Sequence, residues 1–284
     1  MTRTATVQPL LTLCAVALVV ALGGCSPDPD DAGWTGEQLE PVSSIDRTEG
    51  PLWLGAPPTE FAIADEVLAE AARGVVPLRA IGCGAVSNAT AFAVAPGLLV
   101  GAAHVISGAS RVEIDVAVHH AGTAMARPVD VVGYSEERDL ALLRTDAPVS
   151  ALNLDRARLG ATAAVLGYPE GAALEVSPAR IEHYVSARGL WGDGTRRRVY
   201  LLAADVRAGQ SGAPLIDQQG NVVGVAFGRV RGPSGIGFAF SRDDLLSFLV
   251  SSGIDARIDH LGRTVVSAAS AELRQVPNGA CARP

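Results

Sequence analysis

The chain has 284 residues, which is enough for one large all-β domain or for two small barrels and a tail. Hydrophobic residues make up 48% of the sequence and charged residues 19%, a balance that excludes a disordered chain. The formal net charge of −7 at pH 7 argues against a nucleic-acid-binding protein.

The N-terminus is typical of an export signal. Arg3 supplies a positive charge, and residues 10–22 form an apolar stretch that is short for a membrane span. Residues 22–25 (Leu-Gly-Gly-Cys) resemble a bacterial lipobox. That resemblance implies that residues 1–24 are a lipoprotein signal peptide and that Cys25 is lipidated, which would anchor the protein to the outer face of the cytoplasmic membrane, in the periplasm or cell envelope. An ordinary signal peptide or a short membrane anchor is the alternative.

Residues 25–59 are rich in Pro, Gly, Asp, Ser and Thr and have little periodicity, as expected of a flexible tether. The folded domain is therefore predicted over residues 60–284. Residues 61–73 have helical periodicity, and Gly74 stands where a helix C-cap belongs.

From Ala80 onward the pattern changes to short β-rich segments separated by Gly, Pro and Asp. The segments predicted for a first barrel, over about 80–146, are 91–94, 98–100, 111–118, 129–134 and 140–145. The segments predicted for a second barrel, over about 160–241, are 162–167, 174–187, 199–204, 214–217, 222–227 and 237–240. A linker is predicted at residues 146–158. A helix over residues 241–251, with Ser241 as its N-cap, begins the tail 241–284.

Three separate segments carry the residue types of acyl-transfer chemistry. Gly209-Gln210-Ser211-Gly212 places a serine between glycines, so that the backbone can turn tightly and the N–H groups of Gly209 and Ser211 can point at one oxygen. His104 ends an apolar strand pair, and Asp139 stands at the head of a buried strand. Ser211 is therefore the candidate nucleophile, and the two N–H groups are the candidate oxyanion donors. His104 is the candidate general base, and Asp139 is the carboxylate that would orient it.

The segments 102–104 (Ala-Ala-His), 139–143 (Asp-Leu-Ala-Leu-Leu) and 209–214 (Gly-Gln-Ser-Gly-Ala-Pro) resemble the three signature blocks of trypsin-like serine proteases, in that family's order. The resemblance covers about residues 80–252. Within the class, the likeness is to the MarP-type acid-resistance periplasmic proteases of actinobacteria, and more distantly to HtrA without a PDZ domain. The MarP-like features are residues 94–98, 166–169 and 204–207, and a cysteine at each end of the domain.

This resemblance implies an all-β, chymotrypsin-like fold of two six-stranded antiparallel β-barrels, with the catalytic triad in the cleft between them. His104 would take the proton of Ser211 and return it to the leaving amine, Asp139 would hold the imidazole, and Ser211 would form the acyl-enzyme. The implied function is a serine endopeptidase that hydrolyses peptide bonds of extracytoplasmic proteins and needs neither a cofactor nor a metal.

Two residues depart from the family pattern. Ala213 replaces a second glycine, and Gln210 replaces the aspartate that digestive enzymes use to capture a new N-terminus. Ala213 is the only support for the main alternative, a lipid-anchored pseudoprotease that acts as a binding or scaffold module. An esterase that uses the same triad is a third possibility.

The resemblance also implies a primary specificity pocket. Asp205, six residues before the nucleophile, would lie at the bottom of this pocket and favour Arg or Lys, with Gly237 on one wall. The segment Phe227, Gly228 and Arg229 would pair with the substrate backbone. The alternative is that Arg207 pairs with Asp205 and cancels its charge.

The cysteines divide by position. Cys14 lies in the signal and Cys25 in the lipobox, which leaves Cys83 and Cys281 in the folded region. An exported compartment is oxidising, so a disulfide between these two is predicted.

The remaining histidines and the one basic cluster are predicted to be structural or surface residues. His119 and His120 are adjacent on a predicted strand, so their side chains point to opposite faces and could not easily share a metal. His183 and His260 are assigned to the same class, and Arg196–Arg198 is predicted to be the solvated face of a hairpin. The protein is expected to be a monomer whose partners are protein or peptide substrates.

Overall fold

The computed structural model describes residues 45–46, 55–60, 62–117, 124–188, 196–230, 235–260, 263–267 and 273–280. The predicted signal peptide, Cys25, most of the tether, His119, His120 and Cys281 lie outside these residues. None of the helices in the described part of the chain has the length and the apolar character that crossing a bilayer requires.

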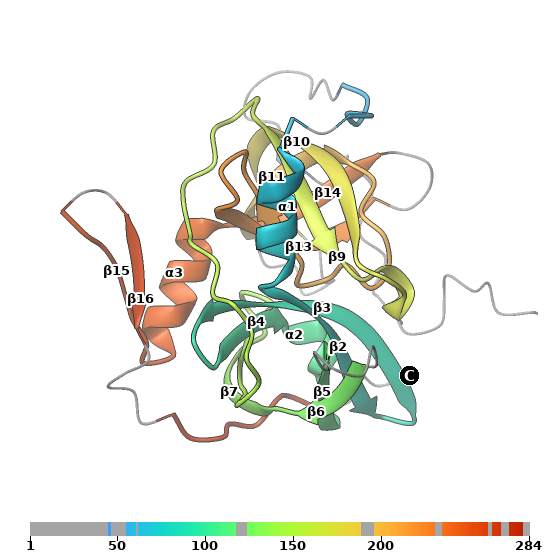
Figure 1. The fold of residues 1–284 in the computed structure, drawn as a ribbon, viewed down its shortest axis with the longest axis vertical. Helices are drawn as coiled ribbons and strands as arrows, with labels where there is room; N and C mark the ends of the chain where they lie inside the picture. Colours follow the sequence, from blue (N-terminus) through green and yellow to red (C-terminus); the bar gives the residue numbers. More distant parts are fainter. Residues whose placement is uncertain are drawn as a thin grey trace, which may run out of the picture.

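Two curled antiparallel sheets are stacked on one another (Figure 1). In the second, six strands close a barrel, because the last strand pairs with the first. In spatial order these strands are β9 (Thr162–Gly167), β10 (Glu175–Arg188), β11 (Arg196–Ala204), β14 (Ile236–Ser241), β13 (Val222–Arg229) and β12 (Pro214–Ile216). A two-residue strand, β1 (Ile45–Asp46), pairs with the far end of β10.

The first sheet has seven strands in the order β6-β5-β2-β3-β4-β8-β7. They are β2 (Val75–Gly82), β3 (Ala85–Ala95), β4 (Leu98–Ala102), β5 (Ala109–Ala117), β6 (Ala124–Pro128), β7 (Asp130–Ser135) and β8 (Leu140–Arg144). Its two edge strands, β6 and β7, are consecutive in the chain and separated only by Val129. The sheet therefore curls back toward itself as a half-barrel, without the closing ladder of the second barrel.

The predicted all-β, chymotrypsin-like class is confirmed, whereas the predicted count of six strands in each barrel holds only for the second. The first barrel was predicted to begin at about Ala80, so most of β2 was not predicted. Pro77, the third residue of this strand, lacks an N–H and lowers the β-propensity of the segment. The ladder forms nevertheless, and Pro77 pairs with Thr90 of β3.

The largest apolar core is shared by the two sheets and joins them. It contains Phe92, Val100 and Leu142 from the first sheet together with Leu166 and Phe238 from the second, all 2% exposed or less. Each fully buried side chain of this kind contributes about 1.5–3 kcal/mol. The interface between the two sheets is therefore packed like a domain interior, and residues on either side of it are held in fixed relative positions.

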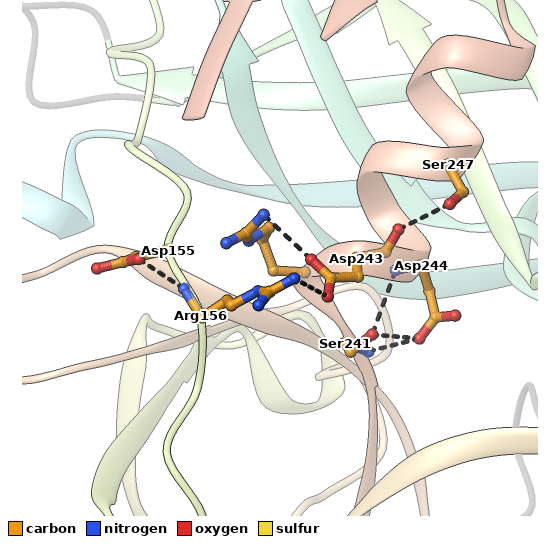
Figure 2. Close-up of polar contacts among 7 residues, drawn as sticks. Asp155, Arg156, Ser241, Asp243, Asp244 and Ser247 are labelled. Carbon is orange, nitrogen blue, oxygen red and sulfur yellow. Dashed lines mark hydrogen bonds and ion pairs between the residues drawn. The ribbon is translucent and has the colours of Figure 1, made fainter. Parts of the chain in front are cut away.

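The two longer helices lie within their predicted ranges. Helix α1 (Asp65–Ala72) is shorter than the predicted range 61–73. Helix α3 (Arg242–Ser251) has Ser241 as its N-cap, as predicted, and Ser241 forms a capping box with Asp244. Figure 2 shows this box and, beside it, Arg156 of the linker pointing toward Asp243, 3.2 Å away.

Several further elements, among them β1 and β6, were not predicted. A one-turn helix, α2 (Ala103–Ile106), follows β4, and a 3₁₀ turn, η3 (Pro169–Gly171), follows β9. A hairpin of β15 (Asp255–Ile258) and β16 (Thr264–Ser267) projects beside α3 (Figure 1). The chain then returns, and residues 273–280 lie along the first sheet, where the N–H of Val276 donates to the carbonyl of Val131 at 2.9 Å.

Candidate active site

His104 and Asp139 are brought together by two neighbouring strands. His104 lies in α2, directly after β4, and Asp139 immediately precedes β8. All five residues of β4 pair with β8, and Ala102 lies opposite Leu140. The end of β4 and the start of β8 therefore lie side by side, which places the two predicted triad residues in contact.

The carboxylate of Asp139 holds His104 at two points. Its Oδ2 lies 2.7 Å from Nδ1 of His104, and its Oδ1 accepts a hydrogen bond from the backbone N–H of His104 at 2.8 Å. The side chain of Asp139 is only 2% exposed. A carboxylate accepts from Nδ1 only when Nδ1 carries the proton, so in the neutral ring this contact leaves the basic lone pair on Nε2.

The turn that carries Ser211 packs directly against the first sheet. Gly209 and Gly212 have φ angles of 87° and 83°, in the left-handed region that favours glycine. A Cβ atom on Gly212 would lie 2.4 Å from the carbonyl oxygen of Thr90 and 2.8 Å from the backbone nitrogen of Ala102. Only glycine allows this approach, and it brings Ser211 next to the end of β4, where His104 begins its turn.

The peptide unit before Gly209 is held from outside the turn. The carbonyl of Ala208 accepts a hydrogen bond from the N–H of Glu170 at 2.8 Å. In a planar trans peptide the N–H points opposite to the carbonyl, so this bond also sets the direction of the N–H of Gly209.

The peptide unit before Ser211 is held in the same way. The carbonyl of Gln210 accepts from the N–H of Ala213 at 3.0 Å, which sets the direction of the N–H of Ser211. Among the residues that the structure describes, neither the N–H of Gly209 nor that of Ser211 donates to a protein acceptor. Two N–H groups without a protein acceptor, one on the serine and one two residues before it, match the donor pair that an oxyanion requires.

The hydroxyl of Ser211 donates to the carbonyl of Phe227 at 3.3 Å. This distance is long for an O–H···O hydrogen bond, so it is a weak contact from which the side chain can rotate at low cost. Phe227 lies in β13, at a bulge between Ala226 and Gly228.

Phe227, Gly228 and Arg229 form the end of β13, beyond the part of the strand that pairs with β12. Gly228 and Arg229 pair with β14, while the ladder between β12 and β13 stops at Val225. An extended peptide can add to such an edge through main-chain hydrogen bonds. The role of residues 227–229 in binding a substrate backbone stays a prediction.

Asp205 and its neighbours lie just after β11. The side chain of Asp205 is exposed, and Arg207 forms its ion pair with Glu175 rather than with Asp205. The predicted alternative, in which Arg207 neutralises Asp205, is therefore not the arrangement that the structure has. A Cβ on Gly237 would lie 2.6 Å from Cγ2 of Val206, so the missing side chain at Gly237 makes room for Val206.

The prediction that Arg196–Arg198 is the solvated face of a hairpin is wrong for Arg197. Its side chain is 9% exposed, and its Nε donates to the carbonyl of Glu137, in the turn that precedes Asp139. Arg198 is exposed, and its guanidinium lies 4.4 Å from the ring centroid of Tyr184. Arg197 thus links β11 of the second barrel to the turn that carries the carboxylate of the site.

A family model for the trypsin-like peptidase domain matches residues 89–225. The serine protease Rv3671c of Mycobacterium tuberculosis is 32% identical over 226 residues, which are 76% of this chain and 54% of the relative. The crystal structure of the active form of that protease matches with a TM-score of 0.66 at 28% identity, and the match covers 82% of this chain and 96% of that chain. The chain belongs to the trypsin-like serine peptidases. The predicted likeness to MarP is confirmed, because Rv3671c is the MarP protease.

The likeness of this trypsin-like peptidase to HtrA is more distant. The mitochondrial serine protease HTRA2 of Bos taurus is 29% identical over 214 residues, which are 69% of this chain and 45% of the relative. The chain spans about half the length of the curated relatives described here.

Gln210, which departs from the pattern of the digestive trypsin-like enzymes, is fully buried and hydrogen-bonded at both ends of its amide. Its Oε1 accepts from the N–H of Arg207 at 2.8 Å, and its Nε2 donates to Oγ of Ser177 at 3.0 Å. A neutral amide therefore holds the turn from within, where the digestive enzymes use an ion pair.

Ala213, the other departure, is fully buried in the core of the second barrel. A Cβ on Gly167 would lie only 3.2 Å from the Cβ of Ala213, so the methyl group of Ala213 occupies the space that Gly167 leaves open. The additional methyl group is accommodated by the core, and it gives no support to a disabled site.

Thr90 contacts the site from the first sheet, a role that was not predicted from the sequence. The hydroxyl of Thr90 donates to the carbonyl of Gly209 at 2.8 Å. The sequence signal for Thr90 was a polar side chain inside the otherwise apolar run 89–95. Such a hydroxyl is buried with its neighbours and therefore requires hydrogen-bond partners.

Proposed function

We propose that this protein is a serine endopeptidase that hydrolyses peptide bonds of extracytoplasmic proteins through His104, Asp139 and Ser211. The observation that carries the proposal is that the N–H groups of Gly209 and of the serine itself donate to no protein acceptor among the described residues. They stand on a turn that packs against the strand leading to His104, whose ring is held by Asp139.

The reaction follows from these positions. The hydroxyl of Ser211 leaves the carbonyl of Phe227, gives its proton to Nε2 of His104 and attacks the substrate carbonyl carbon. The oxyanion that forms accepts hydrogen bonds from Gly209 and Ser211, and donors of this kind each contribute roughly 10²–10³ in turnover. His104 then returns the proton to the leaving amine. A water molecule, deprotonated by His104, hydrolyses the acyl-enzyme and restores the hydroxyl of Ser211.

Labelling with a fluorophosphonate tests this proposal directly, because the reagent reacts with a serine only when that serine is activated. We expect the wild type to be labelled, and Ser211→Ala to lose both labelling and peptide hydrolysis while it keeps the unfolding transition of the wild type. The loss in turnover should be several orders of magnitude.

The matched control is Ser150→Ala, which removes an exposed serine of the linker and should behave as the wild type does. A wild type that is not labelled would favour the pseudoprotease. Labelling together with hydrolysis of esters but not of peptides would favour an esterase. A Ser211→Ala variant that retains more than a few per cent of turnover would refute the assigned triad.

The location and the domain boundaries belong to the same proposal. An anchored, extracytoplasmic enzyme is supported by the lipobox-like residues 22–25 and by the tether-like composition of residues 25–59. The tether separates the lipidated Cys25 from a protease domain at residues 60–284.

The proposed disulfide between Cys83 and Cys281 is supported by the course of the C-terminal tail. The Sγ of Cys83 lies 3.8 Å from the carbonyl oxygen of Ser107, and the hydroxyl of Ser107 donates to the carbonyl of Ala280 at 2.9 Å. The residue before Cys281 is thus held at the same serine that Cys83 contacts.

A further inference from the structure

Thr90 belongs to the first sheet, but its polar atoms contact the second barrel. It lies in β3 and has no exposed surface. Its backbone N–H donates to the carbonyl of Ser211 at 3.0 Å, and its hydroxyl donates to the carbonyl of Gly209 at 2.8 Å. The same hydroxyl accepts from the N–H of Tyr168 at 2.9 Å. One side chain therefore joins β3 to two separate loops of the second barrel.

These two loops are the ones that set the direction of the N–H of Gly209. The first is the turn 208–211 itself. The second is the segment Tyr168–Glu170, whose last N–H donates to the carbonyl of Ala208. The Cα of Gly209 also packs on this segment, because a Cβ there would lie 2.4 Å from the nitrogen of Glu170 and from the carbonyl oxygen of Tyr168.

Fixation from outside is needed at this turn because of its glycine. Glycine populates positive and negative φ angles about equally, so the sequence of the turn does not by itself fix the peptide unit between Ala208 and Gly209. If that unit rotated, a carbonyl oxygen would replace the N–H that faces the developing negative charge. The hydrogen bonds from Thr90 and Glu170 hold the peptide units on both sides of Gly209 and oppose that rotation.

We propose that Thr90 is a positioning residue for the oxyanion hole. Its hydroxyl ties the turn 208–211 and the segment Tyr168–Glu170 to the first sheet, so the N–H of Gly209 is aimed at the oxyanion only while the two sheets are docked. The inference rests on the proposed peptidase function and adds to it a residue outside the triad. Thr90 touches no reacting atom and acts through Gly209.

The test uses three variants of the full chain. Thr90→Val keeps the shape of the side chain and removes its hydroxyl, whereas Thr90→Ser keeps the hydroxyl. The matched control is Thr145→Val, because Thr145 is also a buried threonine and its hydroxyl accepts from the N–H of Ala147 at the other end of the first sheet. Each variant is characterised by kcat, by KM and by the affinity for a peptide aldehyde, whose adduct with the serine carries an oxyanion.

We expect Thr90→Val to lower kcat by roughly ten- to a hundredfold, which is less than the loss of a whole oxyanion donor. The affinity for the aldehyde should fall by a similar factor, while KM and the binding of a non-covalent product peptide change by less than about threefold. Thr90→Ser should recover most of the loss, and Thr145→Val should match the wild type. The amide resonance of Gly209 should shift in Thr90→Val and not in Thr145→Val.

A folded Thr90→Val variant with unchanged kcat, aldehyde affinity and Gly209 resonance would overturn the proposal. Equal losses in kcat, in aldehyde affinity and in product binding would also overturn it, because they would indicate a general distortion of the cleft. If Thr90→Val does not fold, Thr90→Cys replaces it, since a thiol is only a weak hydrogen-bonding group. If fluorophosphonate does not label the wild type, the proposed function itself is contradicted. If the wild type is labelled and Thr90→Val has the same kcat and aldehyde affinity, only the role of Thr90 is contradicted.

Discussion

Asp139 occupies a backbone conformation that few residues adopt. Its φ angle is 49°, in the left-handed region, where aspartate and asparagine are several-fold enriched among residues other than glycine. Its carbonyl accepts from the N–H of Ala103 at 3.2 Å, in addition to the two contacts that its carboxylate makes with His104. The same residue thus provides the turn before β8 and the carboxylate that orients the imidazole.

Asp205 is the residue on which we expect the primary specificity to depend. It is exposed, and its neighbour Arg207 is paired with Glu175, so its charge is available to a cationic side chain of the substrate. We expect the wild type to cleave after Arg or Lys, and Asp205→Ser to lower kcat/KM for such peptides by roughly ten- to a hundredfold, because a hydrogen bond to a charged group contributes about 1.5–3 kcal/mol. A peptide library measures both.

The control is Asp146→Ser, in the linker, which should leave the cleavage profile unchanged. Dominant cleavage after Leu, Val or Phe that Asp205→Ser does not alter would contradict the role assigned to Asp205.

Among the elements, β2 and β5 are linked by a buried carboxylate. Glu113 of β5 is 2% exposed and lies opposite Arg79 of β2, whose Nη2 is 2.7 Å from Oε2 of Glu113. The hydrogen bond from Arg79 holds the pKa of Glu113 below its usual value, with a further contribution from the charge of Arg111, although burial of the carboxyl acts in the opposite direction.

This lowered pKa predicts how stability depends on pH. A carboxyl whose pKa is lower in the folded than in the unfolded chain stabilises the fold above its unfolded pKa of about 4.3, and the contribution is lost as the pH falls through the folded pKa. We expect Glu113→Gln to reduce the free energy of unfolding at pH 7 by about 1–3 kcal/mol and to flatten its decline below about pH 4.3. Denaturant unfolding at a series of pH values measures both effects.

The control for Glu113→Gln is Asp130→Asn, which removes an exposed ion pair with Arg144 and should keep the pH slope of the wild type. If the free energy of unfolding falls equally in Glu113→Gln and in the wild type between pH 5 and pH 3, then Glu113 makes no contribution to the acid sensitivity.

On the scale of the whole molecule, the C-terminal tail is attached to the sheet that carries His104. The side-chain amide of Asn278 donates to the carbonyl of Ile106 at 2.6 Å, and the backbone carbonyl of Asn278 accepts from the N–H of Gly108 at 3.0 Å. Ile106 is the last residue of α2, the helix of His104. Asn278 of the tail therefore supports the turn that carries the predicted general base.

The proposed disulfide between Cys83 and Cys281 would make this attachment permanent. We expect a domain purified from an oxidising compartment to show no alkylatable thiol from either cysteine after unfolding without a reductant, and reduction to lower its Tm. Closing a loop of about 200 residues contributes at most roughly 5 kcal/mol in the chain-entropy model. Cys83→Ser should have the Tm of the reduced wild type and should not respond to reductant. Two alkylatable thiols from Cys83 and Cys281 in the unreduced wild type would rule the bond out.

Features that depend on neighbours in the chain were predictable. The glycines around Ser211, the N-cap at Ser241 and the apolar strands beside His104 and Asp139 follow from turn chemistry, capping and hydrophobic pattern, all of which act over a few residues. The family resemblance supplied the pairing of His104 with Asp139, because the three segments occur in the family's order.

Other features depend on how the two sheets dock. Thr90 and Gly209 are 119 positions apart, and their hydrogen bond exists only because the shared core fixes one sheet against the other. The same holds for Arg197. Its sequence neighbours predicted an exposed side chain, but the turn before Asp139 docks against it and buries it. Local pattern therefore determined which residues carry the chemistry, whereas long-range packing decided which residues hold them in place, because hydrogen bonds between distant segments leave no periodic signal in the sequence.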